Sequence, residues 1–93
     1  MKLVWSDTAI ADLERFAEFL HDNHPAIANR IAPEIVKRAR LIADYPRIGR
    51  PGPGGYRELT LPVLNAVYVL RYTFDADGVL MLRVFHSREQ RDP

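Results

Sequence analysis

Residues 65–87 read NAVYVLRYTFDADGVLMLRVFHS and contain two apolar segments joined by a turn whose register can be worked out. The sequence DADG at residues 75–78 has the chemistry of a three-residue hairpin loop, in which Gly78 adopts the positive φ that closes the turn. Such a loop pairs Asp75 with Val79. Because side chains alternate between the two faces along a strand, the pattern predicts a β-hairpin with one almost wholly apolar face.

Counting outward from this loop gives the residue pairs on each face of the hairpin. On the apolar face we expect Phe74 opposite Leu80, Tyr72 opposite Leu82, Leu70 opposite Val84 and Tyr68 opposite His86. On the second face we expect Thr73 opposite Met81, Arg71 opposite Arg83, Val69 opposite Phe85 and Val67 opposite Ser87. A shift of one residue would mix polar and apolar side chains on both faces, so the hydrophobic pattern supports this register.

The composition is that of one small domain. A chain of 93 residues has room for a single compact core, so we expect one domain over residues 1–93. The net charge of +1 gives no bulk electrostatic reason to bind nucleic acid, although arginine outnumbers lysine eleven to two and favours planar recognition of carboxylate or phosphate. The absence of cysteine excludes disulfides, thiolate nucleophiles and zinc–thiolate sites. The chain also carries no apolar run of membrane-spanning length, so we expect a cytoplasmic protein without membrane contact.

The remaining elements follow from apolar periodicity and from helix-breaking residues. Ser6 or Asp7 caps a first amphipathic helix, and Pro25 is suited to the first turn of a second one. Pro33 predicts a kink or irregular turn near Ala32, without ending the second helix. We expect a strand at 2–5, helices at 7–22 and 25–45, a loop without helix or strand at 46–55, a strand at 56–61, a turn at 62–65, the hairpin, and a frayed tail at 88–93.

This order predicts a two-layer α+β fold, β-α-α-β-β-β, with a mostly antiparallel sheet and a helical hairpin on one face. Two helices cover one face of a four-stranded sheet, so the second face of the hairpin is expected to be open. Exposed apolar groups there would mark a partner surface, and the opposed Arg71 and Arg83 would cost up to about 1 kcal/mol unless an acidic partner shares the face. The expected partner surface consists of Val67, Val69, Arg71, Met81, Arg83 and Phe85. In the alternative, each arginine turns outward and pairs with a nearby acid such as Glu58.

Three histidines are the candidates for acid–base chemistry. His21 and His24 stand at the end of the first helix, where a histidine commonly interacts with the helix dipole. His86 ends the last strand opposite Tyr68, and a hydrogen-bonded histidine at the edge of the core is the favoured explanation for it. The sequence contains no pattern typical of a metal site, a carboxylate pair or a serine–histidine nucleophile, so it specifies no active site, metal or cofactor.

Five segments, taken together and in order, resemble the ParE branch of the ParE/RelE toxin superfamily. They are W-S-D-x-A-x-x-D-L at residues 5–13, YPRIGR at 45–50, GYREL at 55–59, YVLRY at 68–72 and LRVFHSR at 82–88. The resemblance implies a toxin of a bacterial type II toxin–antitoxin pair whose first strand lies beside its last. It also implies a cognate antitoxin whose C-terminal segment wraps the toxin in a hetero-oligomer, which agrees with the partner surface expected above.

The superfamily divides by mechanism into ribosome-dependent endoribonucleases that are RelE-like and DNA gyrase inhibitors that are ParE-like. RelE-like nucleases use a Lys-x-Lys pair on the second strand, an arginine on the third, an arginine after the fourth and a later tyrosine. In this chain the Lys-x-Lys positions hold Arg57 and Leu59, and the arginine position of the third strand holds Val69. Arg88 matches the later arginine, and the tyrosine has no counterpart. Few cations are left to stabilise a pentacovalent phosphate, so we favour a gyrase inhibitor. The candidate target-contact residues are Arg57, Arg83, His86 and Arg88.

Two alternatives stay open. Other nuclease branches place a histidine near the end of the last strand, so His86 could act as base or acid on mRNA at the ribosome, with Arg57 and Arg88 on the phosphate. A chain that has lost toxicity and only binds its antitoxin would also fit. Growth arrest on expression would separate this last alternative from the other two.

Overall fold

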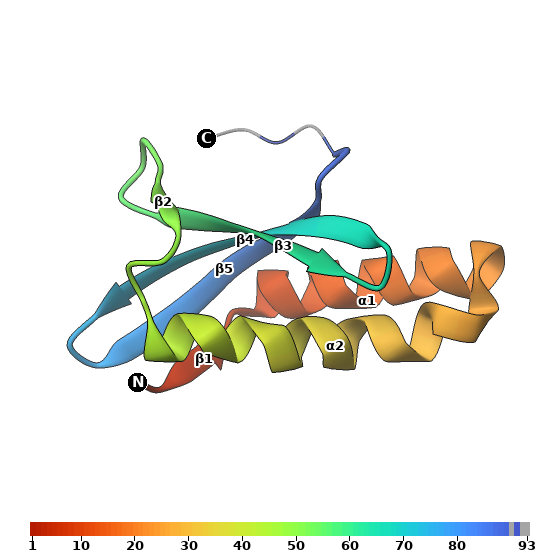
Figure 1. Cartoon of the computed structure of the whole chain (residues 1–93), viewed down its shortest axis with the longest axis horizontal. Coiled ribbons are helices and arrows are strands. Elements are labelled where there is room, and N and C mark those ends of the chain that lie inside the picture. Colours follow the sequence, from red (N-terminus) through yellow and green to blue (C-terminus); the bar gives the residue numbers. More distant parts are fainter. Residues whose placement is uncertain (90, 92–93) are drawn as a thin grey trace.

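The structure is a computed structural model that describes residues 1–89 and 91. The protein has two layers, a sheet and a pair of helices packed under one face of the sheet (Figure 1). The elements are β1 (Leu3–Trp5), α1 (Asp7–Asn23), α2 (Pro25–Asp44), β2 (Arg50–Pro51), β3 (Arg57–Val63), β4 (Ala66–Asp75) and β5 (Gly78–His86). The predicted α+β fold is confirmed, and the predicted elements occur in the expected order with one additional strand, β2.

The sheet has five strands in the order β1-β5-β4-β3-β2. β1 runs parallel to β5 and the other neighbours are antiparallel, so the first strand lies beside the last as the resemblance implied. The loop predicted at 46–55 is wrong in one respect, because Arg50 and Pro51 form the short strand β2 opposite Glu58 and Arg57. A two-residue strand is defined by its partner, so its own sequence gives no periodicity to read.

Local sequence explains the two helices. Ser6 is the N-cap of α1, since its hydroxyl accepts a hydrogen bond from the Ala9 N–H at 3.0 Å, and the same hydroxyl donates to the Leu82 carbonyl of β5 at 3.0 Å. α2 begins at Pro25 and stays helical through Pro33 to Asp44, which confirms one continuous helix and shows no irregular turn at Ala32. Neither helix in the described ranges 1–89 and 91 is long and apolar enough to cross a bilayer.

The β4–β5 hairpin has the predicted register at the end far from its turn and a different register next to the turn. Asp75 pairs with Gly78, so the loop has two residues rather than three. A β-bulge at Leu82 then adds one residue to β5, and from Arg71 opposite Arg83 onward the pairs are those predicted. The shorter loop and the bulge offset each other, which is why reasoning from the turn was wrong near Asp75 and right near His86.

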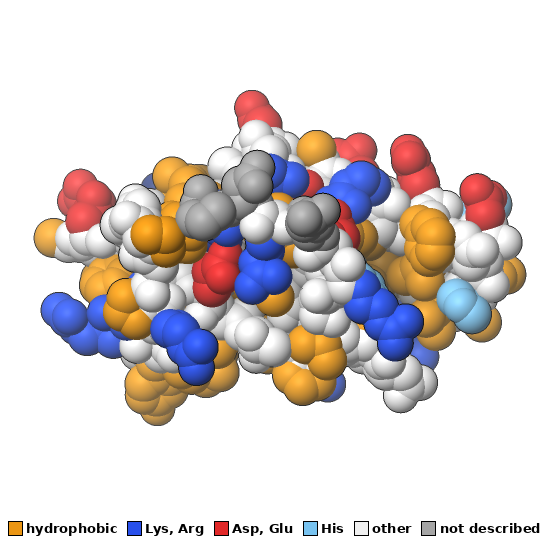
Figure 2. Space-filling model, turned by 90° about the horizontal axis from the view of Figure 1, so that it is seen from above, with side chains coloured by type: hydrophobic (Ala, Val, Ile, Leu, Met, Phe, Trp, Pro, Cys, Tyr) orange, Lys and Arg blue, Asp and Glu red, His pale blue; other side chains and the backbone are white. Residues whose placement is uncertain are grey.

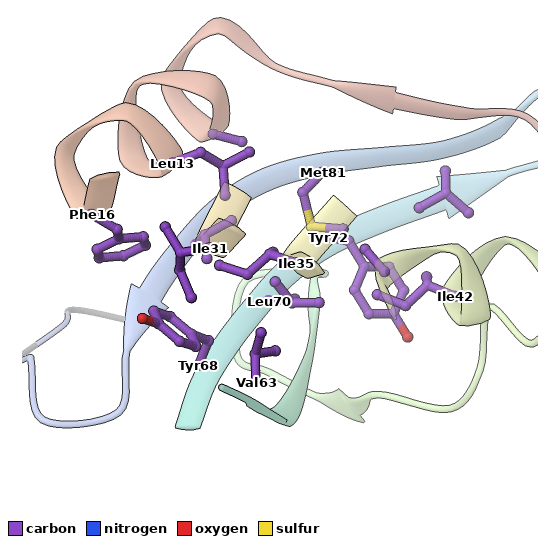
Figure 3. Packing of buried hydrophobic residues seen from close by; sticks show 14 of the residues in the cluster. Leu13, Phe16, Ile31, Ile35, Ile42, Val63, Tyr68, Leu70, Tyr72 and Met81 are labelled. Carbon is purple, nitrogen blue, oxygen red and sulfur yellow. The ribbon is translucent and has the colours of Figure 1, made fainter. Parts of the chain in front are cut away.

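The two-residue loop also changes the face on which Met81 lies, because it shifts the register before the bulge. Met81 pairs with Tyr72, and both side chains are fully buried in the core between sheet and helices (Figure 3). The expectation that Met81 lies on the open face with Arg83 is therefore wrong. With Leu82 as the extra residue, positions 81 and 83 no longer share a face, so Met81 packs in the core cluster with Ile35 and Leu70.

Candidate functional site

The face of the sheet opposite the helices carries an alternating stack of aromatic rings and guanidinium groups. The Arg71 guanidinium lies 4.3 Å from the ring centroid of Tyr56 and 5.0 Å from that of Phe85. Arg83 lies over the same Phe85 ring at 4.8 Å. These arginines help to cover Phe85, which is only 5% exposed, so the apolar centre of this face is closed by the chain's own side chains.

Glu58 of β3 neutralises part of this stack. Its carboxylate lies 2.8 Å from Arg71 and 3.2 Å from Arg91. Burial acts to raise the pKa of Glu58, but hydrogen bonds and charge from Arg91 and Arg71 outweigh it and hold the pKa below 4.5. Figure 2 shows this face directly, with acidic and basic side chains beside each other over its centre.

The expectation of an open apolar face is therefore wrong, and the pairing of Arg71 with Glu58 is the alternative that the structure confirms. Val69 is 3% exposed and Phe85 5%, while Val67 is partly buried. Whether the antitoxin contacts any of the six predicted residues stays a prediction.

Asp12 is a buried carboxylate of α1 that joins this helix to the edge of β5. Its two oxygens accept hydrogen bonds from Arg83 at 2.9 and 3.1 Å, and Oδ2 also accepts the Val84 backbone N–H at 2.8 Å. Arg15 adds a contact at 3.3 Å. Burial acts to raise the pKa of Asp12, but the hydrogen bonds from Arg83, Val84 and Arg15 and the charge of Arg83 outweigh it, so the pKa lies below 3.8.

Sequence reasoning did not single out Asp12 as a structural residue, although a signal was present. It stands between Ala9 and Phe16 at helical spacing, on the same buried stripe as Leu13. A carboxylate within an apolar stripe requires a partner, because burying an unpaired charge is costly. Arg83 therefore stabilises the fold through Asp12, whatever else it contacts.

Arg57 lies at the other end of the sheet from His86. It donates to the carbonyls of Gly49 at 2.7 Å and Arg47 at 3.2 Å, and so holds the loop that leads into β2. Arg57 stands opposite Tyr72 on β4, whereas His86 stands opposite Tyr68. The two levels are four residues apart, or about 13 Å at about 3.3 Å per residue.

His86 ends β5 at the edge of the core, and its ring packs edge-on against Tyr68 with centroids 5.4 Å apart. Its Nδ1 accepts the Arg88 backbone N–H at 3.1 Å, and its own backbone N–H donates to Glu89 Oε1 at 2.7 Å. Since Nδ1 is the acceptor, the neutral imidazole carries its proton on Nε2. His86 is thus held in one tautomer by the turn that follows β5.

His86 and Arg88 line one hollow, which we call the α1–β5 groove. Its volume is about 470 Å³ and it is lined by Arg15, Phe16, Phe19, His86, Arg88 and Glu89. An adjoining hollow of about 320 Å³ shares Phe16, Phe19 and His86 and continues toward Leu64 in the β3–β4 turn. Of the four candidate target-contact residues, the structure brings His86 and Arg88 together here. Arg57 lies at the other end of the sheet, and Arg83 is bound to Asp12, which also contacts Arg15 of the groove.

The tail expected to fray at 88–93 is described only in part, because residues 90, 92 and 93 lie outside the described residues. Glu89 pairs with Arg15, and Arg91 pairs with Glu58.

Within residues 1–89 and 91, no three histidine or acidic side chains gather closely enough to hold a metal ion.

Comparison with known proteins identifies the family. The family model described as "ParE toxin of type II toxin-antitoxin system, parDE" matches residues 3–91. "Toxin RelE2" of Caulobacter vibrioides is 33% identical over 87 residues, which cover 92% of this chain and 94% of that relative. "Putative toxin Y4kP" of Sinorhizobium fredii is 29% identical over 90 residues, covering 96% and 91%.

A solved structure shares the fold. A chain of the "Chromosomal ParDE TA system from P. aeruginosa" superposes with a TM-score of 0.76 at 22% identity, covering 92% of this chain and 95% of that one. The chain described here belongs to the ParE toxin family of type II toxin–antitoxin systems, within the ParE/RelE superfamily.

Proposed function

We propose that this toxin inhibits DNA gyrase by binding it, without catalysing a chemical step of its own, and that its cognate antitoxin neutralises it. Membership of the ParE toxin family supports the proposal, since gyrase is the target that the sequence resemblance implies for this branch. The observation that carries the proposal is the separation of one candidate cation, Arg57, from His86 at the other end of the sheet.

Arg57 is the first part of this argument. A nuclease site needs its phosphate-binding cations and its acid or base to converge on one phosphate. Arg57 is instead bound to the Gly49 and Arg47 carbonyls, about 13 Å along the sheet from the level of His86. Recruiting it to His86 would require these hydrogen bonds to break.

The tautomer of His86 is the second part. A general base must offer a lone pair to the proton that it removes. The Nδ1 lone pair of His86 is engaged by the Arg88 N–H, and Nε2 carries the ring proton. In this geometry His86 is suited to donate a hydrogen bond to a bound partner and is poorly suited to accept a proton from a ribose hydroxyl.

We propose Arg88 and His86 as the main residues for target contact. Arg57 and Arg83 are weaker candidates, because their guanidinium groups are already bound within the fold. Arg88 is exposed, and its guanidinium makes no hydrogen bond or ion pair with any residue among 1–89 and 91. Arg83, by contrast, is bound to Asp12 through two hydrogen bonds. Changing Arg83 would therefore alter folding as well as any contact with gyrase.

The test is a supercoiling assay with purified full-length toxin, gyrase, relaxed plasmid and ATP. We expect loss of supercoiling and accumulation of cleaved DNA, both suppressed when antitoxin is added first. His86→Ala should keep most of this effect, because it removes one contact and no chemistry. A toxin that leaves gyrase unaffected at stoichiometric excess would overturn the proposal.

A second candidate function is ribosome-dependent cleavage of mRNA. It is favoured by one arrangement, since His86 and Arg88 share a groove, and by the names of the relatives, among them "Toxin RelE2". It predicts cleavage at the ribosomal A site in a translation extract that His86→Ala abolishes. A chain inert in both assays but still bound by antitoxin would be a toxin that has lost its activity.

A further inference from the structure

The α1–β5 groove presents an apolar floor of two phenylalanine rings, of which Phe19 is left exposed by residues 1–89 and 91. Phe19 projects from α1 with 63% of its surface accessible, while Phe16 beside it is 6% exposed and packs into the core. Both rings line the groove and its adjoining hollow, whose volumes are about 470 and 320 Å³. Hollows of about 300–1,000 Å³ are typical of sites that enclose a ligand or several side chains.

Hydrogen-bond donors border this apolar floor. The Nε2–H of His86 has no acceptor among residues 1–89 and 91, because the turn to Arg88 uses Nδ1. The exposed guanidinium of Arg88 also has no partner among these residues. Arg15 lines the same groove, although it is shared between Asp12 and Glu89.

The one acidic side chain that lines the groove is already engaged. Glu89 lies 3.1 Å from Arg15 and accepts the His86 backbone N–H at 2.7 Å. Its charge is therefore largely used in holding the turn at 86–89. This leaves Arg88 as an uncompensated cation beside the exposed ring of Phe19, so the groove is complementary to a ligand that is apolar and acidic.

We propose that the α1–β5 groove binds an acidic, amphipathic segment of the antitoxin. In this arrangement an apolar side chain of the segment packs on Phe19 and Phe16, a carboxylate pairs with Arg88, and a carboxylate or carbonyl oxygen accepts the Nε2–H of His86. The proposal rests on the antitoxin partnership of the family and is independent of the gyrase target. It also differs from the surface expected from the sequence, whose apolar residues Val69 and Phe85 are buried.

The experiment is a titration of purified cognate antitoxin into the full-length chain, with variants on the groove and matched variants elsewhere. Phe19→Ser and Arg88→Glu test the apolar and the charged halves of the groove. Tyr45→Ser is the control for Phe19, because Tyr45 is 62% exposed at the end of α2. Arg47→Glu is the control for Arg88, since it reverses an exposed arginine in the loop after α2.

We expect each groove variant to weaken antitoxin affinity by at least about tenfold and each control by less than about threefold. Binding to the parent chain should weaken as salt is raised, and Arg88→Glu should reduce this dependence. Thermal melting of each variant checks that it is folded. The four substituted side chains are all exposed, so these changes should leave the fold intact.

Parent-like affinity of both groove variants would overturn the proposal. Loss in Phe19→Ser alone would refute the acidic character of the segment, and equal loss in Tyr45→Ser would refute the location. If the groove variants lose antitoxin while the parent chain leaves gyrase unaffected, the groove proposal stands and the gyrase proposal fails. If they bind antitoxin normally while the parent inhibits gyrase, the reverse holds.

Discussion

Arg71 and Arg83 face each other directly across β4 and β5, and each is bound to a carboxylate from a different element. Arg71 pairs with Glu58 of β3 at 2.8 Å, and Arg83 reaches Asp12 of α1 at 2.9 Å. Phe85 lies against both guanidinium groups. The repulsion expected of opposed cations is thus relieved within the chain, and no outside anion is needed to explain the pair.

Asp12→Asn should destabilise the fold by about 2 kcal/mol, because the amide keeps one acceptor for the Val84 N–H but loses the charge that holds Arg83. Part of this pair is solvent-exposed, with the Arg83 side chain at 39%, which keeps the effect below that of a fully buried pair. Urea unfolding gives the value. Asp22→Asn, at a carboxylate whose side chain is 84% exposed, is the control and should change stability by less than about 0.5 kcal/mol. Equal effects of the two substitutions would contradict the role given to Asp12.

The free energy of unfolding should fall in acid as Asp12 and Glu58, the two carboxylates that bind Arg83 and Arg71, become protonated. The pKa values of Asp12 and Glu58 are held below 3.8 and 4.5 in the folded state, so folding favours their ionised forms. Their contribution is fully present above the unfolded values and is lost as the pH falls through the folded ones. Melting temperatures from pH 7 down to acid should decline most steeply below about pH 4. Asp12→Asn should flatten this decline. An unchanged pH profile in that variant would show that Asp12 does not contribute to the pH dependence of stability.

Tyr72→Phe should destabilise the fold by about 2 kcal/mol and loosen the loop between α2 and β2. The buried Tyr72 hydroxyl donates to the Pro46 carbonyl at 2.7 Å and accepts the Gly49 N–H at 2.8 Å, so its removal leaves both without that partner. Chemical denaturation reports the stability, and amide exchange at Gly49 reports the loop. Tyr45→Phe, at an exposed ring, should change neither. Unaltered protection at Gly49 would mean that the hydroxyl does not hold the loop.

Gly78→Ala should cost about 2 kcal/mol or more, for two reasons. Gly78 has a φ of 145°, and a Cβ there would lie 2.6 Å from the Lys2 carbonyl oxygen of the segment entering β1. Gly55→Ala is a matched control, because Gly55 also has a positive φ, 78°, but an added Cβ meets nothing within 4 Å. The difference between the two melting temperatures measures the contact with Lys2 together with the greater backbone strain at a φ of 145°. A loss at Gly55 as large as that at Gly78 would show that φ alone matters.

The sequence alone indicated the two helices, the longer strands and the family of this protein. Apolar spacing in α1 and α2, the N-cap at Ser6 and the alternation of residues 66–86 are local signals, because helices and strands repeat over a few residues. The pairing of Arg71 with Arg83 was predicted from the turn and is correct because the shorter loop and the bulge offset each other.

Only the tertiary structure decided what the side chains on those elements contact. The bulge at Leu82 separates Met81 in the core from Arg83 on the outer face, the strand at Arg50–Pro51 exists because β3 pairs with it, and Asp12 lies 71 positions from the arginine that it binds. These features arise from segments far apart in the chain, whose packing no local period encodes. The closed outer face and the exposed groove at Phe19 and His86 follow from that packing, because a side chain is covered or left open by neighbours that the fold brings to it.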